Sequence, residues 1–147
     1  MDSATIEDKV DKMLPPGNLF VGVFSSNTLP HREPPYCFIT NTQPDNEKGE
    51  HWVAFWVEHN FVEFFDSYGR SPENSMFPET FSNFVKNKKC FYNNLILEGI
   101  FSKTCGHFCI YFIVLKSFGA DFETILNTFS DSRIVNDNFV KRFVKWI

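Results

Sequence analysis

Three features are missing from this sequence of 147 residues: a long hydrophobic run, a secretory leader and low-complexity linkers. The longest apolar run, Phe108 to Leu115, has eight residues. About 20 residues are needed to span a bilayer. The first eight residues contain neither a basic stretch nor an apolar core, so no secretory signal is expected. We therefore expect a soluble, intracellular protein without a membrane partner.

An excess of basic residues is also missing. The chain has 14 Lys and Arg against 18 Asp and Glu, which gives a net charge of −4. Proteins that grip nucleic acid through its phosphates are usually basic, so DNA is not expected to be the main partner. Four cysteines in a chain without a signal peptide indicate free thiols rather than a disulfide framework.

A metal-binding pattern is missing as well. Cys105, His107 and Cys109 alternate along a predicted helix, so successive side chains point about 200° apart. No paired Cys-x2-Cys or His-x3-His set accompanies them in the sequence. We expect neither a metal nor another cofactor.

Aromatic residues, in contrast, are abundant. The 19 Phe, three Trp and four Tyr make up 18% of the chain, and 43% of all residues are apolar. That composition supplies a packed core and excludes general disorder. At this length we expect a single domain, residues 1–147, and a monomer. A small domain cannot bury every ring, so exposed rings are expected to mark a groove or a partner surface.

The order of local patterns predicts an α+β fold, with a central mixed β-sheet flanked by helices. Proline and glycine clusters separate short β-prone runs from amphipathic stretches. The predicted strands are 19–24, 37–40, 51–57, 61–65 and 91–97. The predicted helices are 5–14, 78–85, 105–118, 121–129 and 137–146.

Strands 51–57 and 61–65 form the clearest hairpin signal in the chain. A turn centred just after Glu58 would place His51 opposite Asp66, with their Cβ atoms about 4.5 to 5.5 Å apart. A three-residue turn would shift this register by one. An imidazole beside a carboxylate at the open end of a hairpin suits acid–base chemistry, and it equally suits a surface pair at a strand end.

A second candidate is Cys105, which follows Ser102 and Thr104 at the start of the strongest predicted helix. Either hydroxyl residue can cap that helix. In the first turn, the helix dipole and unpaired N–H groups stabilise a thiolate and an oxyanion. Gly106 leaves the approach to Cys105 uncrowded. A lone Cys at a helix start is usually structural, but a His–Asp pair elsewhere in the chain favours a nucleophile.

Four short motifs together resemble the signature of adenovirus-type maturation cysteine proteases, the adenain-like proteases. They are Asn41-Thr42, then 51–55 (HWVAF), 65–69 (FDSYG) and 104–109 (TCGHFC). Similar proteases are carried by Maverick/Polinton transposons and related viruses, and the SUMO-specific proteases resemble them more distantly. The resemblance covers about residues 19–118, and its order of His, acid and Cys differs from that of papain-like proteases.

The resemblance implies an adenain-like cysteine protease fold and a Cys-His-Asp triad. Cys105 would be the nucleophile, His51 the general base and then acid, and Asp66 the carboxylate that orients the imidazole. Trp52 would wall a narrow channel for small residues such as Gly, with Asn41 and Asn94 beside the substrate. The implied substrates are capsid or core precursors of a virus or virus-like transposon. The implied location is the host nucleus or cytoplasm, or the virion.

One position departs from the family pattern. Relatives carry a Gln before the nucleophile whose side chain donates to the oxyanion, whereas Glu98 occupies that place here. An ionised carboxylate cannot donate, and losing one donor typically costs about 10²- to 10³-fold in rate. Three accounts stay open: a protonated Glu98, a replacement donor from Asn93 or Asn94 with backbone N–H groups such as that of Gly106, or an inactive relative that only binds.

The family also uses an activating peptide attached through a cysteine, and Cys90 lies loosely in the corresponding region. An ordinary thiol at a strand start is the favoured interpretation of Cys90. Two further enzyme classes share the triad, namely isopeptidases for ubiquitin-like modifiers and acyltransferases.

Overall fold

The computed structural model describes residues 1–46 and 51–146. Its fold is α+β, as predicted, with one five-stranded sheet and flanking helices. In chain order the elements are α1 (Ser3–Met13), β1 (Phe20–Phe24), β2 (Tyr36–Asn41), β3 (Trp52–Val57), β4 (Phe61–Phe65), α2 (Glu79–Val85), β5 (Lys89–Tyr92), α3 (Cys105–Ser117), α4 (Phe122–Asn127) and α5 (Arg133–Lys145).

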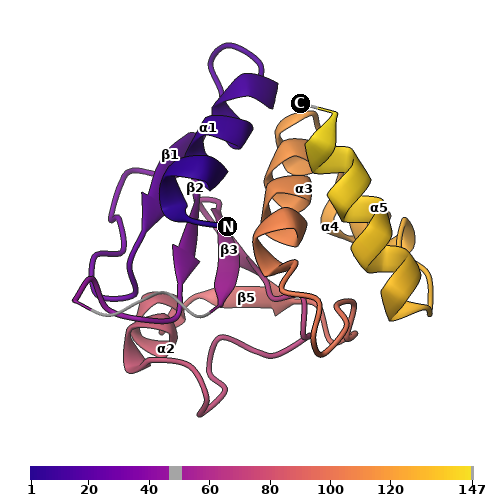
Figure 1. Cartoon of the computed structure of the whole chain (residues 1–147). Helices are drawn as coiled ribbons and strands as arrows, with labels where there is room; N and C mark the ends of the chain where they lie inside the picture. Colours follow the sequence, from indigo (N-terminus) through magenta and orange to yellow (C-terminus); the bar gives the residue numbers. More distant parts are fainter. Residues whose placement is uncertain (47–50, 147) are drawn as a thin grey trace.

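The strands lie in the order β1-β2-β3-β4-β5. The pairs β2–β3 and β3–β4 are antiparallel, whereas both outer pairs, β1–β2 and β4–β5, are parallel. Every residue of the central strand β3 is buried, because both faces of the sheet are covered. Helix α3 packs on β3 and lies between α1 and α5. Figure 1 shows these three helices side by side, with α2 at the other end of the view.

The abundant phenylalanines fill a hydrophobic core on each face of the sheet. Alternate residues of a strand point to opposite faces. Phe65 of β4 therefore joins the core under α3, where its ring stacks on Phe112 at 4.9 Å between centroids. Phe55 of β3 joins the core under α2, where it stacks on Phe38 at 5.0 Å and meets Phe81 edge on. The two hairpin strands carry apolar residues on both faces, which explains why the hairpin lies inside the sheet rather than at its edge.

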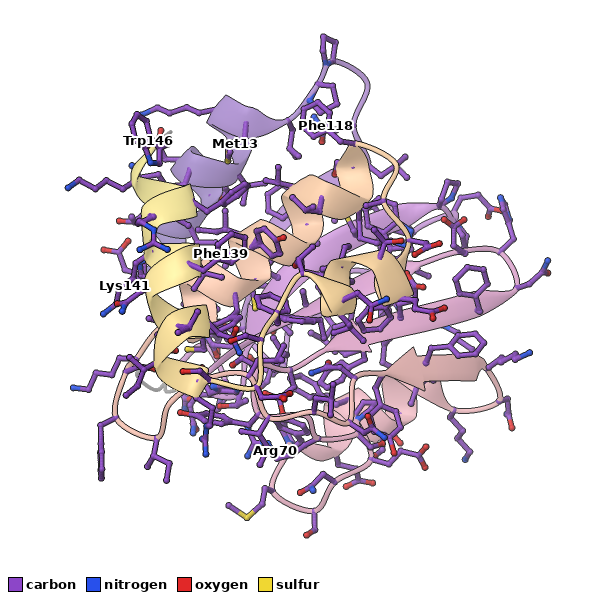
Figure 2. The ribbon with its side chains drawn as sticks, turned by 90° about the vertical axis from the view of Figure 1, so that its right-hand side faces the viewer. Met13, Arg70, Phe118, Phe139, Lys141 and Trp146 are labelled. Atoms are coloured by element: carbon purple, nitrogen blue, oxygen red, sulfur yellow. The ribbon has the colours of Figure 1, made fainter. Side chains whose placement is uncertain are left out.

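Helix α3 is apolar nearly all round, which is the pattern of a buried helix. Its sheet side packs on β3, and its outer side is covered by α5. In Figure 2, Phe139 of α5 lies over α3, where its ring meets Tyr111 at 5.2 Å between centroids. The helix that begins with Cys105 is therefore held firmly on both sides. Among the described helices, none has the length and apolar character needed to cross a bilayer.

The hairpin register differs from the prediction by two residues. Phe55 pairs with Phe64 and Val57 with Val62, so the turn lies after His59 rather than after Glu58. Glu58 extends the hydrogen-bonded pairing of the hairpin, because its N–H donates to the Phe61 carbonyl at 2.8 Å. A shift of two preserves the alternation, so the buried faces are unchanged.

Two elements differ from the predicted bounds by more than two residues at one end. The strand predicted at 91–97 is β5, Lys89–Tyr92, and it ends there because Asn93 leaves the ladder to bond the backbone of Asp66. The last helix begins at Arg133 rather than at residue 137, because Ser132 caps it by accepting the N–H of Val135.

Candidate active site

The three residues predicted to act together lie at the same end of the neighbouring strands β3 and β4. His51 and Cys105 line an open cleft of about 1320 Å³, and Asp66 is buried behind it. His51 directly precedes β3, Asp66 directly follows β4, and Cys105 is the first residue of α3. Because β3 and β4 are antiparallel, the start of β3 and the end of β4 lie side by side at the same end of the sheet. The packing of α3 on β3 brings its first turn there as well.

Asp66 joins His51 to Arg70. Its Oδ1 lies 2.6 Å from Nε2 of His51, and its Oδ2 accepts from Nε of Arg70 at 2.8 Å and from the N–H of Arg70 at 3.0 Å. Burial alone would raise the pKa of Asp66, but the hydrogen bonds and charges of its two partners outweigh burial and lower that pKa. Figure 2 shows Arg70 at the end of the molecule opposite Met13 and Trp146.

The contact between His51 and Asp66 is not the direct cross-strand pair that we predicted. In the observed register, Ala54 pairs with Phe65, so the position opposite His51 is Tyr68. The rings of His51 and Tyr68 stack with centroids 5.2 Å apart, and the Asp66 side chain reaches the imidazole diagonally. Burial, followed by the charges of Glu98 and Cys105, raises the pKa of Tyr68 to about 12, so its hydroxyl remains a donor at neutral pH.

The Cys105 thiol lies between a backbone donor and the imidazole. The N–H of Trp52 donates to Sγ at 3.4 Å. Because Nε2 of His51 is engaged by Asp66, Nδ1 is the ring nitrogen left for Cys105. Burial would lower the pKa of His51, but hydrogen bonds and charges from Asp66 and Cys105 outweigh it and raise that pKa to about 9. The site therefore favours an imidazolium beside the sulfur.

The predicted side-chain cap of α3 is wrong. Thr104 is the N-cap residue, but its side chain makes no cap hydrogen bond. Its hydroxyl donates instead to Oδ1 of Asp137 at 2.8 Å. The N–H groups of the first turn, which include those of Cys105 and Gly106, have no partner within the helix itself. A Cβ added at Gly106 would lie 3.4 Å from the Trp52 ring, so glycine keeps this approach narrow but open.

Glu98 is 1% exposed and acts as an acceptor. Its Oε1 accepts from the Ser67 hydroxyl at 2.5 Å, and its Oε2 accepts from the N–H of Thr104 at 2.9 Å. The Ser102 hydroxyl lies 3.2 Å from the same Oε2. The surroundings thus supply donors to the carboxylate, and this group offers no N–H to a substrate.

The Glu98 carboxylate is also close to the reacting groups. One oxygen of Glu98, one ring nitrogen of His51 and the sulfur of Cys105 all lie within 4.8 Å of one another. Glu98 is the residue that the resemblance implies at the oxyanion position, and its carboxylate lies in the same cluster as the Cys105 sulfur.

Helix α5 holds the loop that carries Glu98. Nε of Arg133 donates to the Glu98 carbonyl at 2.7 Å, and Nδ2 of Asn136 donates to the Leu97 carbonyl at 3.3 Å. Asp137 accepts the N–H of Gly99 at 3.1 Å. Three consecutive loop residues are therefore bonded to α5. No local sequence pattern indicates this role, because the partners are more than 30 residues apart.

The other predicted site residues divide into two groups. Trp52 and Asn41 line the cleft, and Nε1 of Trp52 donates to the Met1 carbonyl at 3.1 Å. Asn94 is exposed and lies outside the cleft lining, and Cys90 lies in the edge strand β5. The Asn93 amide does not replace the missing oxyanion donor, because it donates to the carbonyls of Asp66 and Leu95.

Two cleft residues, Tyr68 and Arg70, were not assigned a role from the sequence. Both follow Asp66 within four positions. An aromatic ring and a cation so close to a candidate catalytic carboxylate are the sequence feature that could have identified them. The four cysteines are free thiols, as expected. Burial raises the pKa of Cys90 to about 11 and that of Cys109 well above its usual value.

No protein-family model matches the chain, and no curated protein matches it. Matching solved structures include two crystal structures of the ASFV pS273R protease, one of them of the Se-Met protein. Each is 19% identical over 71% of this chain, with TM-scores of 0.46 and 0.47. The chain covers 42% and 41% of those proteins, less than half of their length. The adenovirus-type resemblance stays an interpretation.

Proposed function

We propose that this protein is a cysteine endopeptidase with Cys105 as the nucleophile. The single observation that carries the proposal is the position of His51, between the buried Asp66 carboxylate and the Cys105 thiol. A base held in orientation by a third group and placed beside a nucleophile is the arrangement used for acyl transfer.

In this reaction His51 takes the Cys105 proton, and the thiolate attacks the substrate carbonyl. The N–H groups at the start of α3 stabilise the oxyanion. His51 then gives its proton to the departing amine, which leaves a thioester on Cys105. His51 next activates a water molecule, which hydrolyses the thioester and restores the free thiol. Asp66 keeps the imidazole oriented and stabilises its charged form.

Glu98 makes this a weak catalyst. Its carboxylate stands near the sulfur and repels the negative charge that develops on the carbonyl oxygen. The missing donor costs about 10²- to 10³-fold in rate relative to an amide at the same place. Glu98→Gln keeps the shape and adds an N–H₂ group, so turnover should rise strongly.

The substrates of the proposed enzyme are polypeptides cut after small residues such as Gly. Trp52, bonded to the Met1 carbonyl, lines the cleft, and the sequence resemblance implies that the aromatic residue at this place walls a narrow channel for small residues. Capsid or core precursors of a virus or virus-like transposon are the substrates that the sequence resemblance implies.

A second candidate function is binding without turnover, and Glu98 is the observation that favours it. A protein that kept the cleft but lost an oxyanion donor would still hold an extended peptide. Detectable hydrolysis that depends on Cys105 excludes this alternative. Hydrolysis that appears only in Glu98→Gln supports it.

The test compares wild type with Cys105→Ala and Glu98→Gln on peptides with Gly at the cleavage position, using mass spectrometry to detect products. Glu73→Gln, which makes the same charge change at an exposed position, is the control. Cys105→Ala should be inactive, and wild-type cleavage by that variant would contradict the proposal. A parallel assay compares a Gly-Gly ubiquitin-like probe with capsid-derived peptides. Reaction with the probe alone would indicate an isopeptidase, and cleavage of the peptides would indicate an endopeptidase.

A further inference from the structure

His51, Glu98 and Cys105 present three different ligand atoms, a ring nitrogen, a carboxylate oxygen and a sulfur, within 4.8 Å of one another. We propose that these side chains form a binding site for Zn²⁺ or a similar transition-metal ion, and that the bound ion switches the peptidase off. The ligand set differs from Cys105, His107 and Cys109, the set from which no metal was expected.

The chemistry and spacing of the three atoms suit zinc. Zinc prefers sulfur, imidazole nitrogen and carboxylate oxygen, at about 2.0 to 2.3 Å. Neighbouring ligands of a tetrahedral ion then lie roughly 3.3 to 3.6 Å apart. The atoms lie at most 4.8 Å apart, so each pair must close by no more than about 1.2 to 1.5 Å to reach these separations. The ion would keep a fourth position open toward the cleft.

Each ligand already has a partner that orients it. Nε2 of His51 is bonded to Asp66 at 2.6 Å, which leaves Nδ1 for the ion. This is the carboxylate–histidine–metal arrangement that strengthens metal sites. The Glu98 carboxylate is held by Ser67 and by the N–H of Thr104. A pre-oriented set binds more tightly because less ordering is needed on binding.

Charge balance favours the same assignment. A Cys105 thiolate and a Glu98 carboxylate repel each other when both are ionised. Together they carry a charge of −2, which a divalent cation neutralises. The second carboxylate nearby, Asp66, already has Arg70 as its counter-ion at 2.8 Å. In the free site the His51 imidazolium offsets one of these two charges. When the ion binds, His51 releases that proton to become a ligand, and the ion takes over and exceeds its positive charge.

Glu98 is the residue that turns a catalytic pair into a metal site. With a Gln in its place, Cys105 and His51 would supply only two good ligands. With Glu98, a three-ligand set is complete, and its ion occupies the nucleophile and the base at once. Inhibition by the metal rests on the proposed peptidase function, whereas binding of the metal does not.

The experiment titrates metal-free protein with Co²⁺ and follows the thiolate-to-cobalt charge-transfer absorption, then displaces Co²⁺ with Zn²⁺. Wild type should bind one Co²⁺ per chain with this band. Glu98→Gln should bind at least roughly tenfold more weakly, while Glu73→Gln should bind as wild type does. Cys105→Ser should lose the band, and Cys90→Ser should keep it. Circular dichroism checks that each variant is folded.

Equal Co²⁺ affinity of wild type and Glu98→Gln would overturn the proposal, as would a charge-transfer band that persists in Cys105→Ser. The outcome is separate from that of the peptidase test. Cobalt binding that needs Glu98 and Cys105, in a protein without turnover, would retain the metal site and remove the proposed enzyme. Cys105-dependent turnover that Zn²⁺ does not inhibit would retain the enzyme and remove the switch.

Discussion

The Asp137 carboxylate accepts a hydrogen bond from the Thr104 hydroxyl at 2.8 Å, which joins α5 to the residue directly before Cys105. The same carboxylate accepts the N–H of Gly99. Asp137 is 6% exposed, so this link is shielded from water. Asp137 is accordingly a positioning residue for the loop that carries Glu98 and leads into α3.

Asp137→Ala should lower kcat by roughly tenfold, with a smaller change in KM, because the N–H groups at the start of α3 lose their fixed position. It should also lower the free energy of unfolding by about 1 to 3 kcal/mol, since two buried donors lose their acceptor. Steady-state kinetics and urea unfolding measure the two effects.

Asp137→Asn retains one acceptor oxygen and should recover part of the lost kcat. Asp131→Ala, an exposed change close to the start of α5, is the control and should leave both quantities unchanged. A kcat for Asp137→Ala equal to that of Asp131→Ala would contradict a positioning role.

The pH profile should report the His51–Cys105 pair. The folded-state pKa of His51 is raised to about 9 from its ordinary value of 6.5. The imidazolium is therefore retained at neutral pH and is lost as the pH rises through about 9. We expect kcat/KM to fall on the alkaline side with an apparent pKa near that value.

Asp66→Asn should move this alkaline limb to lower pH, because the hydrogen bond and charge of Asp66 help to raise the pKa of His51. The shift should be about one pH unit or more. The same change at the exposed Asp131 should leave the limb in place. An unchanged limb in Asp66→Asn would mean that the limb does not report His51.

Gly69→Ala should destabilise the loop between Asp66 and Arg70. Gly69 has φ +72°, and an added Cβ would lie 2.6 Å from the Leu95 carbonyl oxygen. Gly17 has a similar φ of +74° and open space around it, so Gly17→Ala measures the backbone cost alone. We expect Gly69→Ala to lose roughly 1 to 3 kcal/mol more than Gly17→Ala in urea unfolding. Equal losses would rule out the steric conflict.

The sequence predicted those parts of the fold that depend on local patterns. The run of aromatic and β-branched residues at 61–65 gives β4 its bounds, and the apolar run after Cys105 gives α3 its start. The hairpin register was missed because one backbone hydrogen bond of Glu58 decides it. Periodicity is unchanged by a two-residue shift, so the pattern alone cannot detect the error.

The main residues of the candidate site were predicted from the sequence, but the residues that hold them in place were not. His51 precedes β3, Asp66 follows β4 and Cys105 begins α3, so the placement of each beside a recognisable element could be argued from the sequence. Asp137 bonds to Thr104 across 33 positions. No local pattern encodes such a contact, because it depends on how α5 packs against the loop.

Cys105 is proposed to be an activated nucleophile paired with His51. The most direct measurement is the rate of iodoacetamide alkylation of each cysteine at neutral pH, followed by peptide mass spectrometry. Since thiolate character controls this rate, Cys105 should be alkylated at least roughly tenfold faster than Cys90, and His51→Ala should remove the difference. Alkylation of Cys105 no faster than that of Cys90 would contradict the assignment of Cys105 as an activated nucleophile.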